Sequence, residues 1–353
     1  MGTFELIKKL GHESVVFCQD PASGYYAIIA IHSTVLGPAV GGTRVWPYAS
    51  GDDAIMDALR LSRGMTYKNA VAGLDMGGGK AVIVANSKEI DREKIFRAHG
   101  RFIDRLGGNY ITAEDVGTSP EDMEIIAKET KFVAGLATKG GDPSPYTGRG
   151  VFRAIQAAAK HRWGKDELSD KTIAIQGCGH VGYYLARELH RADAKMVVTD
   201  VDSARVQKVV KEFGATAVEP DEIYKVRANI FAPCALGAII NDKTIPQLNV
   251  EIVAGGANNQ LLEERHGAAL AERGILYAPD YVVNGGGIIS GSVDLLGWSK
   301  ERMESSVENI YDTLLSIFRS AEANNILPFQ AADRLAEERI RRKAESKKAA
   351  DVA

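Results

Sequence analysis

Residues 171–182 read Lys-Thr-Ile-Ala-Ile-Gln-Gly-Cys-Gly-His-Val-Gly, and this stretch decides the fold. A β-prone run at 172–175 leads directly into the motif Gly177-x-Gly179-x-x-Gly182. A helix is predicted over 183–191 and a second strand over 195–200. The motif alone is a weak signal, but between a strand and a helix it is typical of a dinucleotide-binding unit.

An acidic residue supports this interpretation. Asp200 ends the second strand, about 20 residues after the motif, where a carboxylate accepts hydrogen bonds from the adenosine ribose. A carboxylate there repels a 2′-phosphate, so NAD is favoured over NADP. The glycines let a pyrophosphate approach the backbone at a helix N-terminus. The alternative is a purely structural glycine turn, with Cys178 as a small buried filler and His180 at the surface.

The segments that follow alternate between strand and loop. Each contains an apolar run that continues into a glycine-containing loop, at 229–238, 252–259 and 275–287. Loops of this kind line the cofactor crevice of a doubly wound sheet. Asn258, Asn259 and Asn284 are therefore candidates to meet the nicotinamide and the substrate, although turn formation alone explains any one of them.

The first half of the chain carries two lysines in small and apolar surroundings, Lys68 and Lys80. A helix is predicted over 52–65, with Lys68 at or just beyond its end. Three glycines at 77–79 are expected to turn before a strand at 81–85. Burial and the neighbouring like charge should depress the pKa of Lys80, so that it serves as an acid or base. The alternative is a tight turn with exposed lysines, and a nucleotide phosphate loop is rejected because Ala81 stands where a hydroxyl is needed.

Acids and turn residues define the rest of this half. A short strand at 110–114 leads to Asp115, which is well placed to face a cleft or to serve as a helix cap. Ser119 should cap the next helix, with Pro120 at its first position. The glycine-rich segment 36–44 is predicted to be irregular. Residues 139–150 resemble a hinge before a helix at 151–161, and two long helices are expected at 300–324 and 329–347.

Length and composition limit the possible functions. The 353 residues suggest two domains, and the net charge of −3 gives no case for nucleic acid or an anionic membrane as partner. No apolar run reaches the ~18 residues of a membrane span, and the N-terminus is not a signal peptide. The three cysteines show neither a disulfide framework nor metal-ligand spacing, which fits a reducing, cytoplasmic setting without a bound metal.

Together the motifs resemble the Glu/Leu/Phe/Val amino-acid dehydrogenases, and within them leucine dehydrogenases most. The resemblance covers about residues 4 to 341. It rests on the segments 36–44, 65–68, 77–80, 111–115, 177–182, 232–237 and 255–259. It implies oxidative deamination, in which an L-amino acid, NAD and water give a 2-oxo acid, ammonia and NADH.

The resemblance also implies roles for single residues. Lys68 would bind the substrate carboxylate, Lys80 would activate the attacking water, and Asp115 would move protons at the amino group. Gly41 and Gly42 would line the carboxylate end, with Asn284 near the substrate. The cofactor would contact Thr147, Gly177, Gly179, His180, Val181, Gly182, Asp200, Cys234, Ala235 and Asn258.

At the level of the whole chain, the resemblance implies an α/β fold of two domains separated by a cleft. Residues 1–142 and 326–353 would form the substrate and oligomerisation domain, and residues 143–325 a Rossmann-type NAD-binding domain. Members of the family are homo-oligomers, and leucine dehydrogenases are typically octamers.

The substrate side chain is expected to meet Val40, Ala113, Ile288 and Gly291. Gly291 replaces a larger apolar residue of leucine dehydrogenases and leaves room for a bigger substrate. We expect leucine and other branched-chain amino acids, with the same chemistry on phenylalanine or tryptophan as the alternative. A non-catalytic NAD-binding sensor would have no reason to keep Lys68, Lys80 and Asp115 together. A 2-hydroxy-acid dehydrogenase would need a histidine–acid pair, and no histidine lies in a cleft motif.

Overall fold

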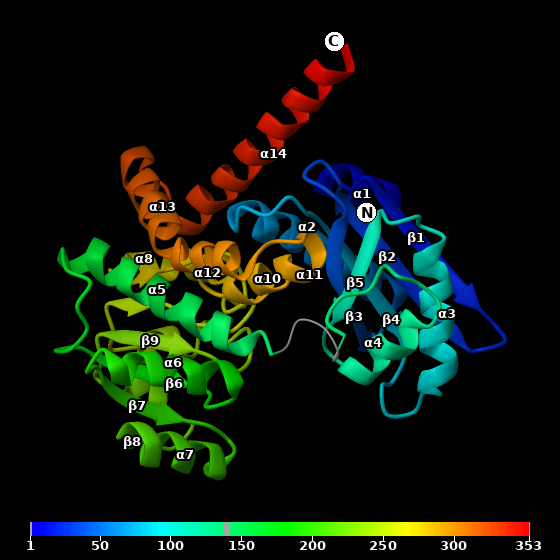
Figure 1. Cartoon of the computed structure of the whole chain (residues 1–353). Coiled ribbons are helices and arrows are strands. Elements are labelled where there is room, and N and C mark those ends of the chain that lie inside the picture. Colours follow the sequence, from blue (N-terminus) through cyan, green and yellow to red (C-terminus); the bar gives the residue numbers. More distant parts are fainter. Residues whose placement is uncertain (1, 137–141, 353) are drawn as a thin grey trace. The chain divides into compact units, whose positions relative to one another are not determined.

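The computed structural model describes residues 2–136 and 142–352, which form two compact units (Figure 1). Unit 1 comprises Met1–Gly141, Gly291–Trp298 and Ala336–Ala353, and unit 2 comprises Asp142–Ser290 and Ser299–Leu335. The C-terminal residues thus join unit 1 from Ala336 rather than from residue 326, and a short segment at 291–298 belongs to unit 1 as well.

Unit 1 is built on a five-stranded mixed sheet of order β1-β2-β4-β3-β5, drawn in blue to cyan in Figure 1. β2 is antiparallel to β1 and β4, whereas β3 is parallel to β4 and β5. The strands are β1 (Ser14–Asp20), β2 (Tyr25–Ser33), β3 (Ala39–Trp46), β4 (Gly77–Val84) and β5 (Tyr110–Glu114). The helices are α1 (Thr3–Leu10), α2 (Gly51–Val71), α3 (Arg92–Asp104), α4 (Pro120–Ala127) and α11 (Ser292–Leu296).

Alternation along the central strands gives this sheet two apolar faces. Ile28 of β2 and Val82 of β4 pack with α2, whereas Ile29 and Ile83 pack with α3 and α4. α4 starts as predicted, because Ser119 and Asp122 form a capping box and Pro120 follows the cap. The sheet is therefore covered by helices on both faces, and β4 lies buried in its middle.

Three predictions about unit 1 are wrong. Residues 39–46 form strand β3 rather than an irregular segment. Glycines 77–79 open strand β4 instead of making a turn before it. Helix α2 continues past residue 65 to Val71, so Lys68 lies inside its last turn. For β3 and β4 the reason is that Gly41, Gly42, Gly77 and Gly78 provide space for neighbouring backbone, a use that sequence does not distinguish from turning.

Unit 2 is a six-stranded parallel sheet of order β11-β10-β9-β6-β7-β8. Counted along the chain, this is the doubly wound order of a Rossmann fold, as predicted. The strands are β6 (Thr172–Gln176), β7 (Lys195–Thr199), β8 (Thr216–Ala217), β9 (Ile230–Pro233), β10 (Ile252–Val253) and β11 (Leu276–Tyr277). An apolar cluster beneath the sheet joins Phe231 and Val253 to residues around the short helices η1 (Ile223–Lys225) and η2 (Ile245–Gln247).

The helices of unit 2 differ from the prediction in two places. The helices are α5 (Ser144–Trp163), α6 (His180–Arg191), α7 (Ser203–Phe213), α8 (Arg265–Glu272), α9 (Asp280–Val283), α10 (Gly286–Ser290), α12 (Lys300–Glu308) and α13 (Ile310–Asn324). α5 begins at Ser144, so the predicted hinge is helical from there on, and its part at 139–141 lies outside the described residues. A Cβ at Gly148 would lie 2.7 Å from the Tyr184 Cβ, so this glycine permits close packing of α5 on α6. The helix predicted at 300–324 is interrupted at Asn309, a residue of weak helix propensity.

The last helix, α14 (Pro328–Val352), begins in unit 2 and belongs to unit 1 from Ala336 on. Arg339 donates to the carbonyl oxygens of Asn69, Ala70 and Leu74 at 3.2, 2.9 and 2.8 Å. These carbonyls lie at and just beyond the C-terminal end of α2, where a cation is favourable. The C-terminal helix therefore completes the end of the helix that carries Lys68.

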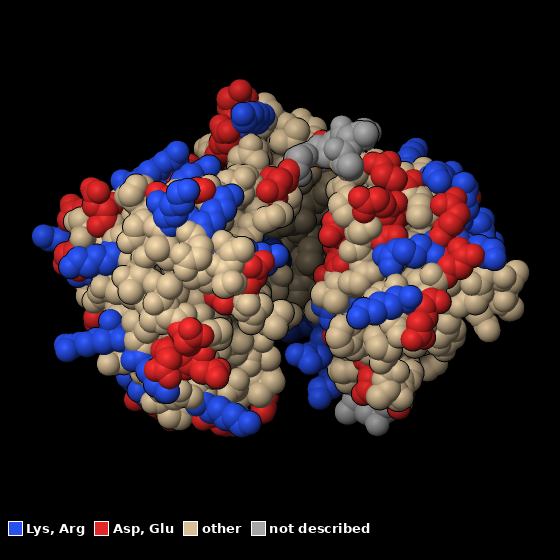
Figure 2. Space-filling model, turned by 90° about the horizontal axis from the view of Figure 1, so that it is seen from below, with Lys and Arg blue, Asp and Glu red and all other residues tan. Residues whose placement is uncertain are grey.

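The surface of each unit carries charges of both signs. Figure 2 shows Lys and Arg side chains interspersed with Asp and Glu on the face in view. No helix within the described ranges is long and apolar enough to cross a membrane. In the same ranges, no group of three or more His, Cys, Asp or Glu side chains is arranged to hold a metal ion.

Candidate active site

The centre of unit 1 is an ion pair between Lys80 and Asp115. Lys80 projects from β4, and its Nζ lies 2.9 Å from Asp115 Oδ1. Its side chain is only 5% exposed, so the amine is almost fully removed from water. Burial lowers the pKa of Lys80, and the nearby guanidinium of Arg44 lowers this pKa further, against the opposing effect of Asp115. The depressed pKa was predicted from burial and a neighbouring like charge, and Arg44 is one like charge that contributes to it.

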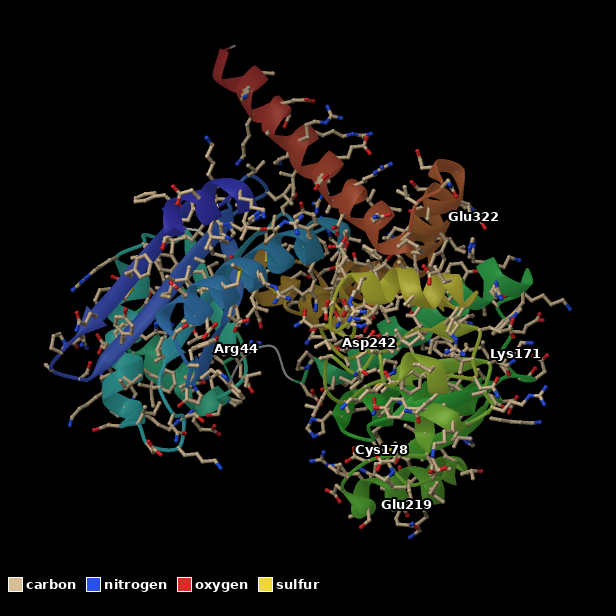
Figure 3. All side chains as sticks on the ribbon, turned by 180° about the vertical axis from the view of Figure 1, so that it is seen from behind. Arg44, Lys171, Cys178, Glu219, Asp242 and Glu322 are labelled. Atoms are coloured by element: carbon tan, nitrogen blue, oxygen red, sulfur yellow. The ribbon has the colours of Figure 1, made fainter. Side chains whose placement is uncertain are left out.

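Asp115 follows the last residue of β5 and is held on several sides. Its backbone N–H donates to Thr118 Oγ1 at 2.8 Å, and Arg44 Nε donates to its Oδ2 at 2.8 Å (Figure 3 labels Arg44). Burial raises the pKa of Asp115, but Lys80 and Arg44 outweigh this, so the net pKa lies below the ordinary value. Asp115 is therefore ionised near neutral pH, and it is not a helix cap, since Ser119 caps α4.

Lys68 belongs to the same region because α2 packs tightly on β4. A Cβ at Gly78 would lie only 2.1 Å from the backbone nitrogen of Thr66, so only glycine allows this approach. Asn69 Nδ2 donates to the Gly77 carbonyl at 2.6 Å and joins the end of α2 to the start of β4. Lys68 follows Thr66 by two residues and Lys80 follows Gly78 by two. The close approach of helix and strand thus brings the two lysine-bearing segments together.

Four of the other predicted residues of unit 1 lie on neighbouring strands. Val40, Gly41 and Gly42 belong to β3, and Gly42 pairs with Ala113 of β5. A Cβ at Gly42 would lie 2.8 Å from the Asp115 Cβ, which explains why glycine stands there. Gly291 is the N-cap residue of α11 and also belongs to unit 1.

The glycine loop of unit 2 has the geometry that a dinucleotide requires. Gly177 has φ +101°, and Gly179 caps the N-terminus of α6. A Cβ at Gly182 would lie 1.9 Å from the Gly177 carbonyl oxygen, so a side chain would prevent the loop from closing on the helix. Asp200, directly after β7, accepts a hydrogen bond from the Cys178 N–H at 2.7 Å. The loop presents a helix N-terminus beside a carboxylate, and these residues fit NAD.

The remaining residues of the motif are placed as expected. His180 is exposed at the start of α6, and Val181 follows it. Cys178, labelled in Figure 3, is buried, and its pKa is raised to about 12 by burial. A thiol with this pKa stays protonated and inert, which agrees with a filler role.

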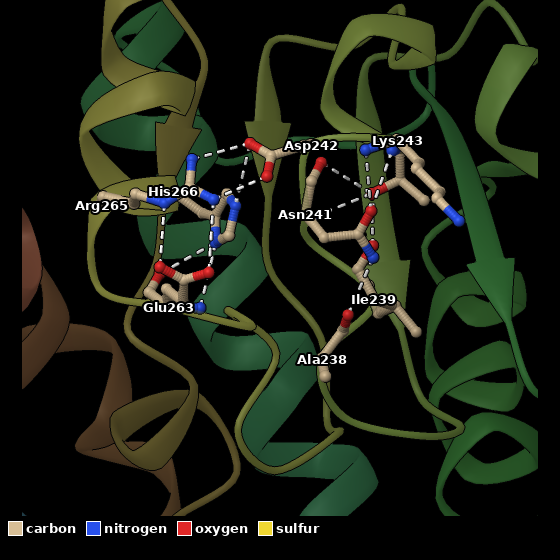
Figure 4. A network of polar contacts seen from close by, with 9 residues as sticks. Ala238, Ile239, Asn241, Asp242, Lys243, Glu263, Arg265 and His266 are labelled. Atoms are coloured by element: carbon tan, nitrogen blue, oxygen red, sulfur yellow. Dashed lines mark hydrogen bonds and ion pairs between the residues drawn. The ribbon is translucent and has the colours of Figure 1, made fainter.

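A second loop comes close to this motif. Cys234 and Ala235 follow β9, and a Cβ at Gly177 would lie 2.8 Å from the Ala235 Cβ. The chain beyond this loop is held by a polar network (Figure 4). Arg265 pairs with Asp242 at 2.6 Å and Glu263 at 2.9 Å, and the buried His266 ring lies 3.3 Å from Asp242 Oδ1. The network joins the loop that follows β9 to the start of α8.

Asn258 and Asn284 meet in unit 2. Asn284 is buried, and its Nδ2 donates to Asn258 Oδ1 at 2.8 Å. Asn259 has a positive φ of 50°, so the turn interpretation applies to this asparagine. A Cβ at Gly287 would lie 2.8 Å from Thr147 Oγ1, and Ile288 is the next residue of α10. Thr147 and the segment 284–288 are thus neighbours within unit 2.

Sequence reasoning missed the residues that support these groups. Arg44 lies in the glycine-rich segment 36–44, and no role was predicted for it, although it contacts Asp115 directly. Asp57, Tyr48, Asn69 and Arg339 were not singled out. The sequence signal that could have indicated Arg44 is its charge, because the residues around it are small or apolar. The others become visible only through contacts between distant segments.

Comparison with known proteins gives the family. The model of the Glu/Leu/Phe/Val dehydrogenase dimerisation domain matches residues 12–132. The Glutamate/Leucine/Phenylalanine/Valine dehydrogenase model matches residues 142–206 and 198–347. Leucine dehydrogenase of Thermoactinomyces intermedius is 54% identical over 96% of this chain and 94% of its own length. L-tryptophan dehydrogenase of Nostoc punctiforme is 49% identical over 99% of both chains.

Solved structures agree with the sequence relatives. The crystal structure of L-tryptophan dehydrogenase from Nostoc punctiforme has a TM-score of 0.88 and 48% identity. It covers 97% of this chain and 99% of its own. The chain therefore belongs to the Glu/Leu/Phe/Val dehydrogenase family and is an NAD-dependent amino-acid dehydrogenase.

Proposed function

We propose that the protein oxidatively deaminates L-leucine and other branched-chain L-amino acids. The overall reaction converts the amino acid, NAD⁺ and water into the 2-oxo acid, ammonium, NADH and a proton. The observation that carries the chemistry is the buried pair of Lys80 and Asp115, next to the helix end that bears Lys68. The choice of leucine is supported by the 54% identity to a leucine dehydrogenase.

Each side chain has a proposed task. Lys68 holds the substrate carboxylate as a compact cation. Lys80, whose pKa is lowered by burial, takes the proton from the water that attacks the imino carbon. Asp115 accepts and returns the proton of the amino group. Lys80 and Asp115 lie within hydrogen-bond distance of each other, so a proton passes between them without diffusing through solvent.

NAD supplies the hydride acceptor when it is bound. The proposed contacts are Thr147, Gly177, Gly179, His180, Val181, Gly182, Asp200, Cys234, Ala235 and Asn258. The glycine loop would receive the pyrophosphate at the N-terminus of α6, and Asp200 would accept from the ribose hydroxyls. Both are supported by the tight packing of Gly182 on the loop and by the place of Asp200 beside Cys178 N–H.

Substrate contacts beyond Lys68 are also proposals. Gly41, Gly42 and Asn284 are assigned to the polar end of the amino acid. Val40, Ala113, Ile288 and Gly291 are assigned to its side chain. The same chemistry on tryptophan or phenylalanine is the second candidate. It is favoured by the glycine at 291 and by the 49% identity to an L-tryptophan dehydrogenase.

At the molecular level we propose a cytoplasmic homo-oligomer, with unit 1 as substrate and oligomerisation domain and unit 2 as NAD-binding domain. The match of residues 12–132 to a dimerisation-domain model supports the oligomer. An octamer is the expected state, and sedimentation of the purified protein tests it.

The experiment that tests the function is the reduction of NAD at alkaline pH, with the standard amino acids offered singly. We expect the highest kcat/KM for leucine, followed by valine and isoleucine. Turnover only with tryptophan or phenylalanine would replace leucine by the second candidate. NAD binding without any turnover would contradict the proposed activity.

A further inference from the structure

Arg44 contacts two carboxylates of unit 1 with different nitrogens. Its Nε lies 2.8 Å from Asp115 Oδ2, and its Nη1 lies 2.9 Å from Asp57 Oδ2. Lys80 contacts the other oxygen of Asp115, Oδ1, at 2.9 Å. Both oxygens of this carboxylate therefore have a fixed cationic partner, one on β3 and one on β4.

Arg44 is itself held in place from a second side. Asp57 projects from α2, and the Tyr48 hydroxyl donates to its Oδ2 at 2.5 Å. The Arg44 and Asp57 side chains are 20% and 26% exposed, so solvent competes only in part for their hydrogen bonds. The planar guanidinium can serve two carboxylates at once with little loss of freedom, which a lysine ammonium cannot do in the same geometry.

The backbone around Asp115 is already fixed without Arg44. Thr118 Oγ1 accepts from the Asp115 N–H at 2.8 Å, and the Val45 N–H of β3 donates to the Val116 carbonyl at 2.9 Å, which joins this loop to β3. Gly42 packs against the Asp115 Cβ, because a Cβ at position 42 would lie only 2.8 Å from that atom. What remains free is rotation of the carboxylate about its side-chain bonds, and the contact with Arg44 Nε removes that freedom.

We propose that Arg44 is a positioning residue for the oxidation: it holds Asp115 Oδ2 so that Oδ1 stays on Lys80 Nζ, and Asp57 and Tyr48 hold Arg44. This inference rests on the proposed function, because it concerns the pair that would handle the protons.

The charges around the pair make the proposal measurable. Lys80 faces Asp115, Arg44 and Asp57, whereas Asp115 faces Lys80, Arg44, Glu114 and Tyr110. Arg44 lowers the pKa of Lys80, and Asp57 raises it. Loss of Arg44 should therefore move the alkaline rise of activity to higher pH, and loss of the Asp57 charge should move it to lower pH.

The test compares Arg44→Gln, Arg44→Lys and Asp57→Asn with the wild type. Arg44→Gln should lower kcat about 10- to 100-fold with little change in the KM for leucine, because a misplaced group costs rate rather than binding. The midpoint pH at which kcat/KM rises should also be higher than in the wild type, by about one pH unit. Arg44→Lys should keep the wild-type pH midpoint but not the wild-type kcat. Asp57→Asn should lower kcat less and move the midpoint downward.

Arg97→Gln is the matched control. Arg97 also joins two carboxylates, Glu93 at 2.6 Å and Glu129 at 2.7 Å, but it lies on α3 away from Lys80. Its kcat and pH midpoint should equal those of the wild type. Wild-type kcat and pH midpoint in Arg44→Gln would overturn the proposal, as would full recovery of kcat in Arg44→Lys. If Arg44→Gln does not fold, the kcat and pH midpoints of Arg44→Lys and Asp57→Asn still test the proposal.

A measurement without turnover separates this inference from the proposed function. The acetylation of Lys80 by acetic anhydride, followed by mass spectrometry across pH, reports when the amine loses its proton. Absence of wild-type turnover with every amino acid contradicts the function alone. An Arg44→Gln acetylation midpoint equal to that of the wild type contradicts the role of Arg44, whether or not the enzyme turns over.

Discussion

A substitution that removes the Lys80 amine does not leave the Asp115 carboxylate without a hydrogen-bond donor. In Lys80→Ala, Asp115 keeps its hydrogen bond from Arg44, so no buried carboxylate is left unpaired. We expect kcat to fall by about 10²- to 10⁴-fold, the usual contribution of a general base. The Kd for NAD should stay within twofold, because the glycine loop lies in unit 2. Steady-state kinetics and isothermal titration calorimetry with NAD measure the two quantities.

Lys68→Ala provides the contrast on the neighbouring helix. Its main effect should be a higher KM for leucine, because a carboxylate partner is lost while the base remains. Substantial turnover in Lys80→Ala would show that another group is the base. A Lys68→Ala variant with wild-type KM would remove Lys68 from the carboxylate site.

Asp200 has two functions that substitutions can separate. Its carboxylate accepts from the N–H groups of Cys178 and Asp202 at 2.7 and 2.9 Å, and it is the proposed ribose acceptor. Asp200→Asn keeps an oxygen for Cys178 but loses the negative charge, so discrimination against NADP should fall about tenfold. Asp200→Ala should also weaken both cofactors, because the loop loses its support. The measurement is the ratio of kcat/KM for NAD to kcat/KM for NADP in each variant. An unchanged ratio in both variants would show that Asp200 does not determine the choice of cofactor.

At the scale of elements, the contact between α2 and β4 depends on one missing methyl group. Gly78→Ala would place a Cβ 2.1 Å from the Thr66 nitrogen, so helix and strand must move apart. We expect a loss of at least about 1–3 kcal/mol in the free energy of unfolding, as for overpacked cores, together with a higher KM for leucine. Urea unfolding and steady-state kinetics provide both measurements.

Gly64→Ala is the control on the same helix. Gly64 is exposed, and nothing lies within 4 Å of the position of its Cβ. Alanine there should raise the free energy of unfolding by about 0.5–1 kcal/mol, since glycine weakens helix interiors. Equal stabilities for the two variants would contradict the packing explanation.

This contact also shows what sequence could and could not provide. The strand–loop–helix at 172–191, the acid at Asp200 and the cap at Ser119 were predicted because each depends on neighbours in the chain. The strand character of β3 and the first residues of β4 was missed, because Gly42 and Gly78 accommodate segments that are distant in sequence. Local propensity contains no information about such a neighbour.

The candidate site divides in the same way. Lys68, Lys80 and Asp115 could be singled out as residue types, and the lowered pKa of Lys80 followed from its apolar surroundings. The contact between Lys80 and Asp115 depends on the order β4-β3-β5. The role of Arg44 depends on that order and on the place of α2, which no single segment specifies.

For the molecule as a whole, buried histidines predict sensitivity to acid. Burial lowers the pKa of His32 to about 4 and that of His99 to about 3, from an ordinary value of 6.5. Below pH 6.5 these histidines bind protons in the unfolded chain but stay unprotonated in the folded chain. The stabilisation is therefore complete above pH 6.5 and is lost progressively as pH falls toward 4. For His32 this amounts to about 3 kcal/mol.

Urea unfolding at several pH values between 7.5 and 4.5 measures this loss. A His32→Asn variant should show a smaller slope of unfolding free energy against pH than the wild type. His190→Asn, which changes an exposed residue, should keep the wild-type slope. Equal slopes in the wild type and His32→Asn would contradict the assignment to His32.

The hydrogen bonds from Arg339 to the end of α2 have a consequence for biosynthesis. They join residues 265 to 270 positions apart in the chain. A ribosome releases residues 69–74 long before it translates the codon for Arg339. In the nascent chain the carbonyls of Asn69, Ala70 and Leu74 therefore stay bonded to water until almost the entire polypeptide has been made. A premature stop codon shortly before residue 339 would delete no proposed catalytic group, yet its product would lack the guanidinium that completes this helix.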